Sequence, residues 1–167
     1  RISADPDIIA NLTPYILKGI HDAGVADSCK HYPGAAKDYR DSHFSSTLND
    51  TTREEWYANE FKIWKAAVDA GAMSFMTGHS AFPAIDDSFV KDGVRRPCSA
   101  SKKVLDIARK ELNYDGVLIT DAVDMKGLAA AFEHDDMYIE CLNAGHDIVL
   151  FCHNDYIDVI EKVFVHE

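Results

Sequence analysis

The chain has 167 residues, of which 47% are apolar and 27% charged, the composition of an ordinary globular domain that can bury a core. Its net charge of −11 at pH 7 repels nucleic acid and anionic membranes, so we expect neither as a partner. No apolar run approaches the roughly 18 residues that a membrane-spanning helix needs. The first ten residues also lack the apolar segment of a secretory signal.

The cysteines and histidines do not have the spacing of a metal site. Cys29, Cys98, Cys141 and Cys152 form neither a metal-ligand pattern nor a disulfide framework. We therefore expect free thiols in a reducing compartment, with the cytoplasm favoured. There is no tight H-x-x-x-H spacing, and the sequence predicts no metal and no cofactor.

Helical patterns alternate with short apolar runs along the whole chain. The first helix is predicted to start at Asp5-Pro6, an N-cap followed by proline at the first helical position, and to continue to Ile20. Pro14 lies within its apolar stripe and is expected to kink or split it. Four more helices are predicted: from the Thr52–Glu55 capping box to Gly71, from Ser101 to Leu112, from about Asp136 to Asn143, and from about Asp155 to Val165.

Between these helices lie four predicted strands: Val25 to Cys29, Ala72 to Met76, Gly116 to Thr120, and Asp147 to Phe151. The last three are mostly continuous apolar runs, which is typical of parallel strands that are buried on both faces. Alternating strands and helices predict right-handed βαβ units. A (β/α)₈ barrel needs about 250 residues, so four units are either a small open α/β domain or half of a barrel. Periodicity alone does not decide between these two.

Titratable side chains follow each predicted strand. Lys30-His31 comes after the first, His79 after the second, Asp121 after the third and His153 after the fourth. Functional residues of parallel α/β proteins gather at these carboxyl ends of the strands. Each residue taken alone has a simpler interpretation, since Asp121 could equally cap the next helix and His153 is expected to be a loop residue.

The longest loop carries Asp41 and His43, two residues apart. Side chains at this spacing in extended backbone point the same way, so the carboxylate can orient the imidazole and fix its tautomer. An isolated D-x-H is more often a pair of solvated loop residues, because loops lie mostly at the surface.

Taken together and in order, the motifs resemble glycoside hydrolase family 3. The matching segments are Lys30–Gly34 (KHYPG), Asp41–His43 (DSH), Ala70–His79 (AGAMSFMTGH), Glu111–Ala122 (ELNYDGVLITDA) and Ala144–Leu150 (AGHDIVL). The D-x-H loop is similar to that of the β-N-acetylglucosaminidase (β-hexosaminidase) members. This resemblance implies a (β/α)₈ TIM-barrel type fold, of which residues 1–167 would be a single partial catalytic domain, the C-terminal half of the barrel.

The resemblance also implies roles for individual residues. Asp121 would be the nucleophile that forms a covalent glycosyl-enzyme, and His43 the general acid/base with Asp41 as its partner. Lys30 and His31 would bind sugar hydroxyls, and His79 and Met125 would occupy positions in the substrate pocket. Retaining hydrolysis needs an ionised carboxylate below the anomeric carbon and a proton donor at the leaving oxygen, and a neighbouring Lys30 would keep the carboxylate ionised. The expected partner is a carbohydrate substrate.

Three alternatives remain open at this stage. An incomplete barrel leaves sheet edges and an inner face uncovered, so the chain could be an inactive half barrel that self-associates, or one that needs the other half of the barrel as its partner. An imidazole acid/base repels anionic acceptors less than a carboxylate would, which allows phosphorolysis instead of hydrolysis. Lys30 at the end of a strand could also form a Schiff base, which borohydride trapping of a carbonyl substrate would reveal.

Overall fold

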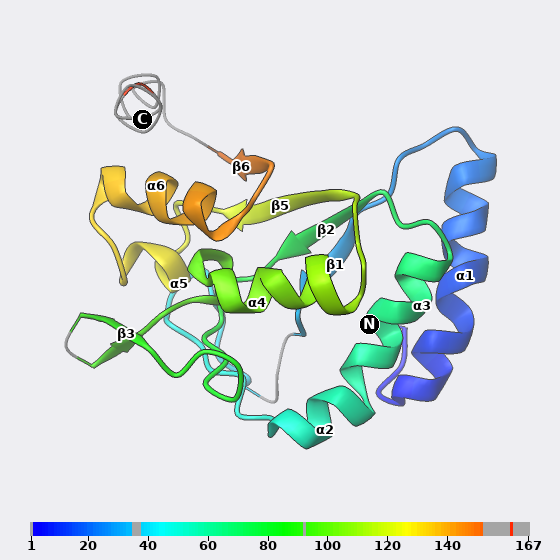
Figure 1. Cartoon of the computed structure of the whole chain (residues 1–167), viewed down its shortest axis with the longest axis horizontal. Coiled ribbons are helices and arrows are strands. Elements are labelled where there is room, and N and C mark those ends of the chain that lie inside the picture. Colours follow the sequence, from blue (N-terminus) through cyan, green and yellow to red (C-terminus); the bar gives the residue numbers. More distant parts are fainter. Residues whose placement is uncertain (1, 35–37, 92, 152–160, 162–167) are drawn as a thin grey trace.

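The computed structural model describes residues 2–34, 38–91, 93–151 and 161. Four parallel strands form one sheet in the order β1-β2-β5-β6 (Figure 1). Their bounds are Cys29–Tyr32 for β1, Ser74–Thr77 for β2, Val117–Ala122 for β5 and Ile148–Leu150 for β6. The predicted parallel α/β class is therefore confirmed, and the last three strands lie where the sequence placed them.

Six α-helices accompany the strands in the described part of the chain. They are α1 (Pro6–Asp22), α2 (Arg53–Ala58), α3 (Glu60–Asp69), α4 (Lys102–Asp106), α5 (Lys126–Ala129) and α6 (His134–Ala144). A π-helical turn, Ile107–Glu111, continues α4, and a hairpin of β3 (Phe89–Lys91) and β4 (Val94–Arg95) precedes a 3₁₀ turn at Cys98–Ala100. The hairpin and the 3₁₀ turn had no counterpart among the predicted elements.

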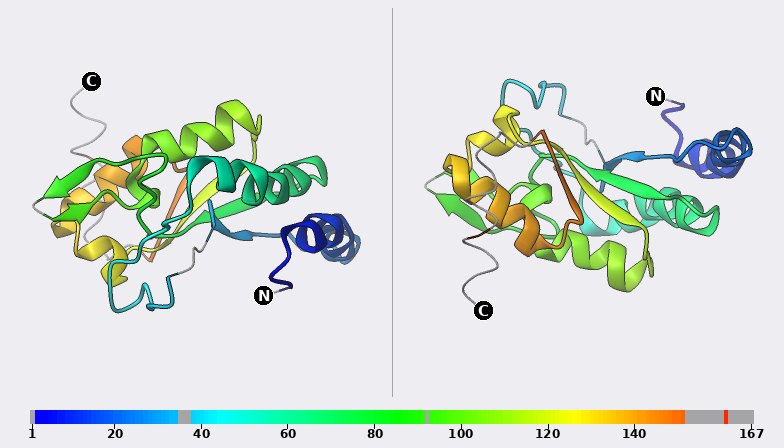
Figure 2. Two further views of the ribbon diagram at one scale, coloured as in Figure 1. Left: turned by 90° about the horizontal axis from the view of Figure 1, so that it is seen from below. Right: turned by 90° about the horizontal axis from the view of Figure 1, so that it is seen from above.

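The helices α3, α4 and α6 cover one face of the sheet (Figure 2). Phe75 of β2 and Leu118 of β5 pair in register and are fully buried on this face. The alternate residues Met76 and Ile119 point to the opposite face and are only half-buried. One covered and one open face is the arrangement expected for about four units of a (β/α)₈ barrel, whose inner face is normally filled by the other strands.

Helix α1 runs unbroken through Pro14, so the proline does not split it. Asp5 caps its first turn by accepting a hydrogen bond from the backbone of Asp7, as the sequence predicted. The helix packs along α3 at one end of the molecule (Figure 1).

The single helix predicted from the Thr52–Glu55 capping box to Gly71 is wrong in one respect, because it breaks at Asn59 into α2 and α3. The indole N–H groups of Trp56 and Trp64 both donate to the carbonyl oxygen of Pro33, each at 2.9 Å. Eight residues of straight helix would separate these two positions by about 12 Å along the axis. The break at Asn59 lets both indoles reach the carbonyl oxygen of Pro33, which lies at the start of the long loop between β1 and α2.

The first strand begins four residues later than predicted, and Lys30 and His31 lie within β1 rather than after it. The buried Asp27 carboxylate explains the difference. It accepts hydrogen bonds from the backbone N–H of Met73 and lies 2.6 Å from the His21 ring. The Asp27 side chain thus takes the place of the backbone hydrogen bonds that a strand over residues 25–28 would make to the neighbouring strand.

The predicted helix from Asp155 to Val165, together with Cys152 and His153, lies outside the described residues. No helix in the described part of the chain has the length and apolarity required to span a bilayer.

We expect Asp27→Ala to lower the free energy of unfolding by about 2–3 kcal/mol, because it removes the buried carboxylate that accepts from the Met73 N–H and contacts the His21 ring. Urea denaturation of the variant measures this loss. The exposed carboxylate of Asp115 provides a control, since Asp115→Ala should change stability by less than about 0.5 kcal/mol. Equal effects of the two substitutions would show that Asp27 does not hold the start of β1.

Candidate active site

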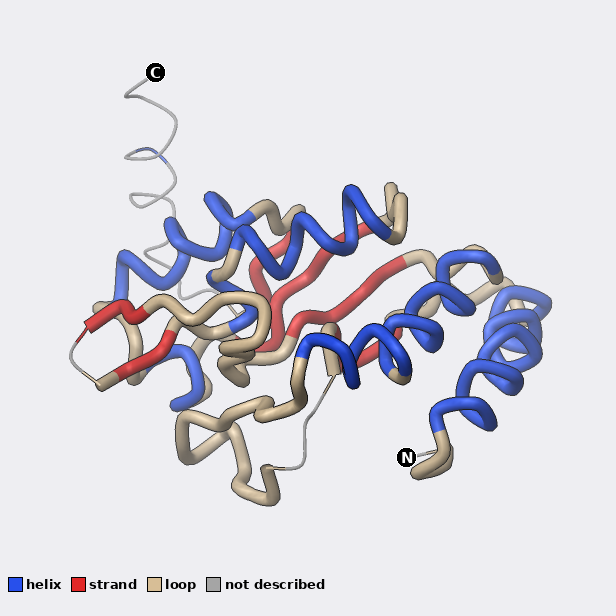
Figure 3. The backbone as a smooth tube through the Cα atoms, turned by 60° about the horizontal axis from the view of Figure 1, so that its bottom comes forward, coloured by secondary structure: helices blue, strands red, loops and turns tan. Residues whose placement is uncertain are grey.

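A pocket of about 450 Å³ lies at the carboxyl ends of β1, β2 and β5. The long loop between β1 and α2 runs beside these strand ends and forms the opposite wall (Figure 3). Five of the residues predicted from the sequence line this pocket: His31, Asp41, His43, His79 and Asp121. The structure thus brings together groups from three strand ends and a loop.

Asp121 lies near the end of β5, half-buried in the pocket wall. Burial alone would raise its pKa, but hydrogen bonds from the His31 ring and the Ala122 amide outweigh it and lower the pKa to about 2. The His31 Nε2 atom lies 3.2 Å from Oδ2, and the Ala122 N–H donates to Oδ1 at 2.9 Å. Asp121 is therefore an ionised carboxylate at neutral pH.

The cation next to Asp121 was expected to be Lys30, but the residue in contact is His31. Both belong to β1, in which the peptide bonds Lys30–His31 and Tyr32–Pro33 are cis. Lys30 pairs with Met76 on the open face of the sheet and is exposed. Its predicted role as a sugar ligand stays a prediction.

Asp41 and His43 form the pair that their spacing predicted. The Asp41 carboxylate lies 2.7 Å from Nδ1 of His43 and also accepts a hydrogen bond from the His43 backbone N–H at 2.9 Å. These bonds lower the pKa of Asp41, so it is ionised and acceptor-only. Nδ1 of His43 therefore carries the proton in this pair, which leaves Nε2 free to exchange one with a substrate.

The loop that bears this pair is anchored at both of its ends. Near its start, Asp38 forms an ion pair with Arg40 and also accepts a hydrogen bond from the backbone N–H of Leu48. Near its end, Asn49 donates through its backbone to the carbonyl of Ala81, just beyond β2. The loop is thus closed on itself and tied to the sheet.

The middle of the loop is held by the first turn of α5. The backbone N–H groups of Lys126 and Gly127 donate to the carbonyls of His43 and Ser42, at 3.3 Å and 3.0 Å. The first N–H groups of a helix have no partner within it, and here the loop supplies the acceptors. Because α5 begins shortly after Asp121, these bonds fix the position of the loop relative to the Asp121 carboxylate on the other side of the pocket.

His79 is buried behind Asp121, and both of its ring nitrogens are hydrogen-bonded to the protein. Nε2 lies 2.9 Å from the carbonyl oxygen of Ala122, and Nδ1 lies 2.7 Å from the hydroxyl of Ser99. Burial lowers the pKa of His79, which favours the neutral ring. Ser99 and Gly127 were both missed from the sequence, because Ser99 lies in a segment without periodicity and Gly127 stands in a four-residue helix.

Met125 is buried at the start of α5, where its carbonyl accepts from Leu128 and Ala129. It does not line the pocket, so its predicted contact with substrate also stays a prediction. In the described part of the chain, no group of three or more His, Cys, Asp or Glu side chains could hold a metal ion. The chemistry available to the pocket is that of an ionised carboxylate, Asp121, opposite an imidazole, His43.

Comparison with known sequences assigns this chain to a family. The sequence model described as "Glycosyl hydrolase family 3 N terminal domain" matches residues 2–166. The chain belongs to glycosyl hydrolase family 3.

Its relatives in this family include hexosaminidases. The chain is 30% identical over 155 residues to a β-N-acetylglucosaminidase/β-glucosidase of Cellulomonas fimi, covering 90% of this chain and 28% of that protein. It is 29% identical over 157 residues to a β-hexosaminidase of Stenotrophomonas maltophilia (strain K279a), covering 93% of this chain and 44% of that protein. The chain thus spans less than half the length of these relatives.

A solved structure confirms the fold that family 3 membership implies. The structure of the β-glucoside phosphorylase BglX superimposes with a TM-score of 0.84 and 28% identity, over 93% of this chain and 29% of that one. The partial (β/α)₈-type architecture is therefore that of a family 3 catalytic barrel.

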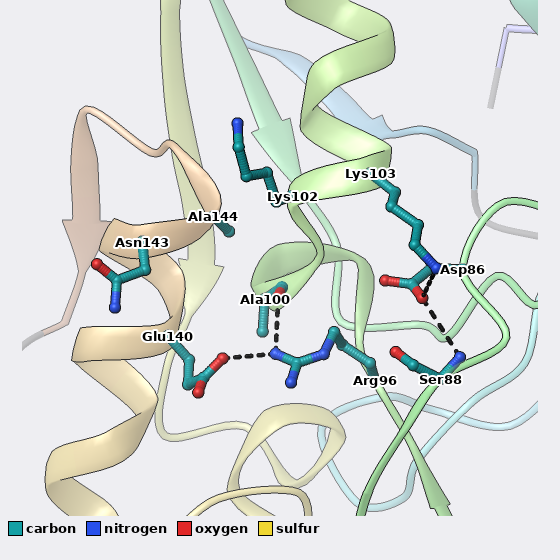
Figure 4. Close-up of a pocket in the computed structure, with 9 residues that line it drawn as sticks. All are labelled: Asp86, Ser88, Arg96, Ala100, Lys102, Lys103, Glu140, Asn143 and Ala144. Atoms are coloured by element: carbon teal, nitrogen blue, oxygen red, sulfur yellow. Dashed lines mark hydrogen bonds and ion pairs between the residues drawn. The ribbon is translucent and has the colours of Figure 1, made fainter.

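A second cavity, of about 340 Å³, lies between α4, α6 and the segment before β3 (Figure 4). Its charged side chains are paired with one another or with a neighbour: Lys103 with Asp86, Arg96 with Glu140, and Lys102 with Asp106. This pairing neutralises the lining, so the cavity lacks the separated carboxylate and imidazole of the pocket at the strand ends.

We predict that His31→Leu, which removes the donor to Oδ2, raises the pKa of Asp121 from about 2 toward its ordinary value of 3.8. In the wild type the lowered pKa stabilises the folded state at pH values above about 4, and this contribution is lost as the pH falls from about 4 to 2. NMR titration of the Asp121 carboxyl carbon measures the shift directly. His21→Leu, which changes a histidine that contacts Asp27 instead, should leave the Asp121 titration in place. An unchanged pKa in His31→Leu would mean that His31 does not stabilise the ionised form.

Proposed function

We propose that this chain carries the catalytic residues of a retaining β-N-acetylglucosaminidase, which hydrolyses terminal β-N-acetylglucosaminides through a covalent glycosyl-Asp121 intermediate. The observation that carries the proposal is that Asp121, ionised and held by two hydrogen bonds, shares one pocket with the paired Asp41 and His43. Family membership supports glycoside hydrolysis as the class of reaction.

In the first step an Asp121 oxygen attacks the anomeric carbon as the bond to the leaving oxygen breaks. His43 in its protonated form gives the Nε2 proton to that oxygen, and the leaving alcohol departs. Asp41, bonded to Nδ1, stabilises the positive charge of the imidazolium before the transfer and holds the ring in one orientation.

In the second step His43 acts in the opposite sense. Its neutral Nε2 takes a proton from water as the water oxygen attacks the anomeric carbon, and the bond to Asp121 breaks. The sugar is released with its original anomeric configuration, and both residues return to their starting states. His31, which donates to Oδ2, stabilises the carboxylate as it leaves.

The N-acetyl group in this proposal rests on the names of the relatives, two of which are hexosaminidases or N-acetylglucosaminidases. We propose that Lys30, one residue before His31 on β1, binds a hydroxyl group of the same sugar. A neutral sugar also suits a protein with a net charge of −11, because it is not repelled by the acidic surface.

A second proposal concerns the chain on its own. The open face of the sheet exposes Val117 and Ile148, and its two edge strands, β1 and β6, have free hydrogen-bonding sides within the described residues. We infer that this face is closed either by the other half of a barrel or by a second copy of the chain. A chain that lacks such a partner would be an inactive half barrel.

The hydrolysis proposal predicts release of the aryl group from an aryl β-N-acetylglucosaminide, with the rate falling by at least about 10⁴-fold in Asp121→Ala. Absorbance of the released phenol measures it, with the aryl β-glucoside assayed alongside. His43→Gln should lose most activity on substrates with poor leaving groups, since a good leaving group departs without a proton. Asp124→Ala alters another carboxylate near the turn and serves as the control. Equal rates in the wild type and Asp121→Ala would contradict the assignment of the nucleophile.

The half-barrel proposal predicts that the isolated chain self-associates, and that Ile148→Glu, which places a charge on the open face, weakens the association. Sedimentation velocity over a range of concentrations measures it. Phe89→Glu on the exposed β3–β4 hairpin adds the same charge elsewhere and should not change the distribution. A compact monomer at every concentration would argue that the open face does not pair with a second copy.

A further inference from the structure

We propose that His79 is a positioning residue which, together with Gly127, forms a joint that fixes Asp121 and the Asp41–His43 loop relative to one another. This inference rests on the proposed function for its catalytic meaning, because it assigns a role to groups behind that same site. The sequence placed His79 in the substrate pocket, but its ring nitrogens are directed at the protein.

The hydrogen bonds of His79 define its protonation. A backbone carbonyl only accepts, so Nε2 must carry the hydrogen that bonds to Ala122. In the neutral ring Nδ1 then accepts from the hydroxyl of Ser99, which is itself fully buried. Burial lowers the pKa of His79, which is consistent with this single tautomer.

The bond to Ala122 extends to the nucleophile through one residue. The carbonyl of Ala122 is held by His79, while its N–H donates to Oδ1 of Asp121 at 2.9 Å. A residue fixed at both of its backbone groups cannot rotate freely, so His79 holds the donor that orients the Asp121 carboxylate.

The Cβ atom of His79 lies against Gly127, and Gly127 in turn contacts the loop. A Cβ atom at Gly127 would lie only 2.9 Å from Cβ of His79 and 3.3 Å from the carbonyl oxygen of Ser42. The absent side chain therefore allows α5 to contact His79 on one side and the loop on the other. At this contact the Gly127 N–H donates to Ser42.

These contacts join the two catalytic groups into one unit. His79 supports Asp121 through Ala122, and its Cβ atom packs against Gly127, which donates to the loop. The turn that carries Asp121 leads directly into α5, so a change in the His79 donor should loosen this turn and, through α5, the Asp41–His43 loop. A wall residue that only contacts sugar would affect neither backbone segment.

Two substitutions at His79 separate the effect of its Nε2 hydrogen-bond donor from the effect of its side-chain volume. The amide nitrogen of Gln reaches about as far as Nε2 of His, whereas that of Asn reaches only as far as Nδ1. His79→Asn should therefore lose the bond to Ala122 and keep the one to Ser99. His79→Gln should restore the donor and rescue the protein.

Hydrogen exchange followed by mass spectrometry measures the joint without any substrate. In His79→Asn, peptides covering 38–48 and 121–129 should exchange at least about 10-fold faster than in the wild type, while His79→Gln recovers most of the protection. In an assay of the aryl β-N-acetylglucosaminide, His79→Asn should lower kcat about 10–100-fold with KM changed less than about 3-fold.

Gly127→Ala provides a test that does not alter His79. Alanine favours a helix over glycine, so a purely local effect would leave exchange unchanged or slower. The joint predicts faster exchange in 38–48, because the added Cβ pushes α5 away from His79 and Ser42. This variant also decides the question if His79→Asn fails to fold, as judged by circular dichroism.

The proposal of the joint would be overturned if hydrogen exchange of residues 38–48 were unchanged in Gly127→Ala. It would also be overturned if His79→Asn folded and showed wild-type exchange in both segments. Equal loss in His79→Gln and His79→Asn would also overturn it, since only bulk would then matter. Absence of turnover by the wild-type chain bears on the proposed function alone, because the exchange rates still decide whether the joint exists.

Discussion

The parallel, in-register pairing of β2 with β5 places every other part of the site. Thr77 pairs with Thr120, so the chain leaves the sheet at the same edge just before His79 and at Asp121. β1 pairs on the other side of β2 and brings His31 to that edge. The pairing is stabilised on the helical face, where Phe75 stacks on Tyr114 with ring centroids 4.0 Å apart and meets Trp64 edge-on. The core that orders this edge of the sheet therefore lies on the opposite side of the sheet from the open face, away from the groups that line the pocket.

Hydrogen-bond partners then set the ionisation state of each carboxylate that we propose to be catalytic. A half-buried carboxylate with no partner would tend to be neutral, which is the wrong form for a nucleophile. Two donors, His31 and the Ala122 amide, reverse that tendency at Asp121. Asp41 is exposed, and its two hydrogen bonds with His43 lower its pKa further below the ordinary value. The carboxylates of Asp121 and Asp41 are thus suited to two different proposed roles, because their hydrogen-bond partners differ although the group is the same.

The sequence was sufficient to predict what depends on local pattern and on strand ends. The last three strands and the placement of His79 and Asp121 at one edge follow from periodicity and parallel topology, whereas the Asp41–His43 loop was expected at this site from the family resemblance. What it could not predict depends on contacts distant in sequence. The helical pattern breaks at Asn59, and the indoles on either side of the break, Trp56 and Trp64, both donate to the carbonyl of Pro33. The strand β1 starts late because Asp27 accepts a hydrogen bond from the backbone N–H of Met73, 46 residues further along the chain. The Ser99–His79 bond spans 20 residues and leaves no periodic signal.

The nature of the acid/base bears on which acceptor completes the reaction. In the proposed reaction the negative charge of Asp121 is gone once it is esterified to the sugar, and the His43 imidazole separates the ionised Asp41 carboxylate from the acceptor. An anionic acceptor therefore meets less repulsion than in a two-carboxylate site. One structural relative is a β-glucoside phosphorylase by name. Binding phosphate, however, calls for a cation that faces it. Arg40 on the loop is committed to Asp38 by three hydrogen bonds of 2.6–3.1 Å, and His31 is directed at Asp121. A phosphate acceptor in this pocket would therefore need a cation other than Arg40, such as the exposed Lys30, whereas water needs only the proposed base His43.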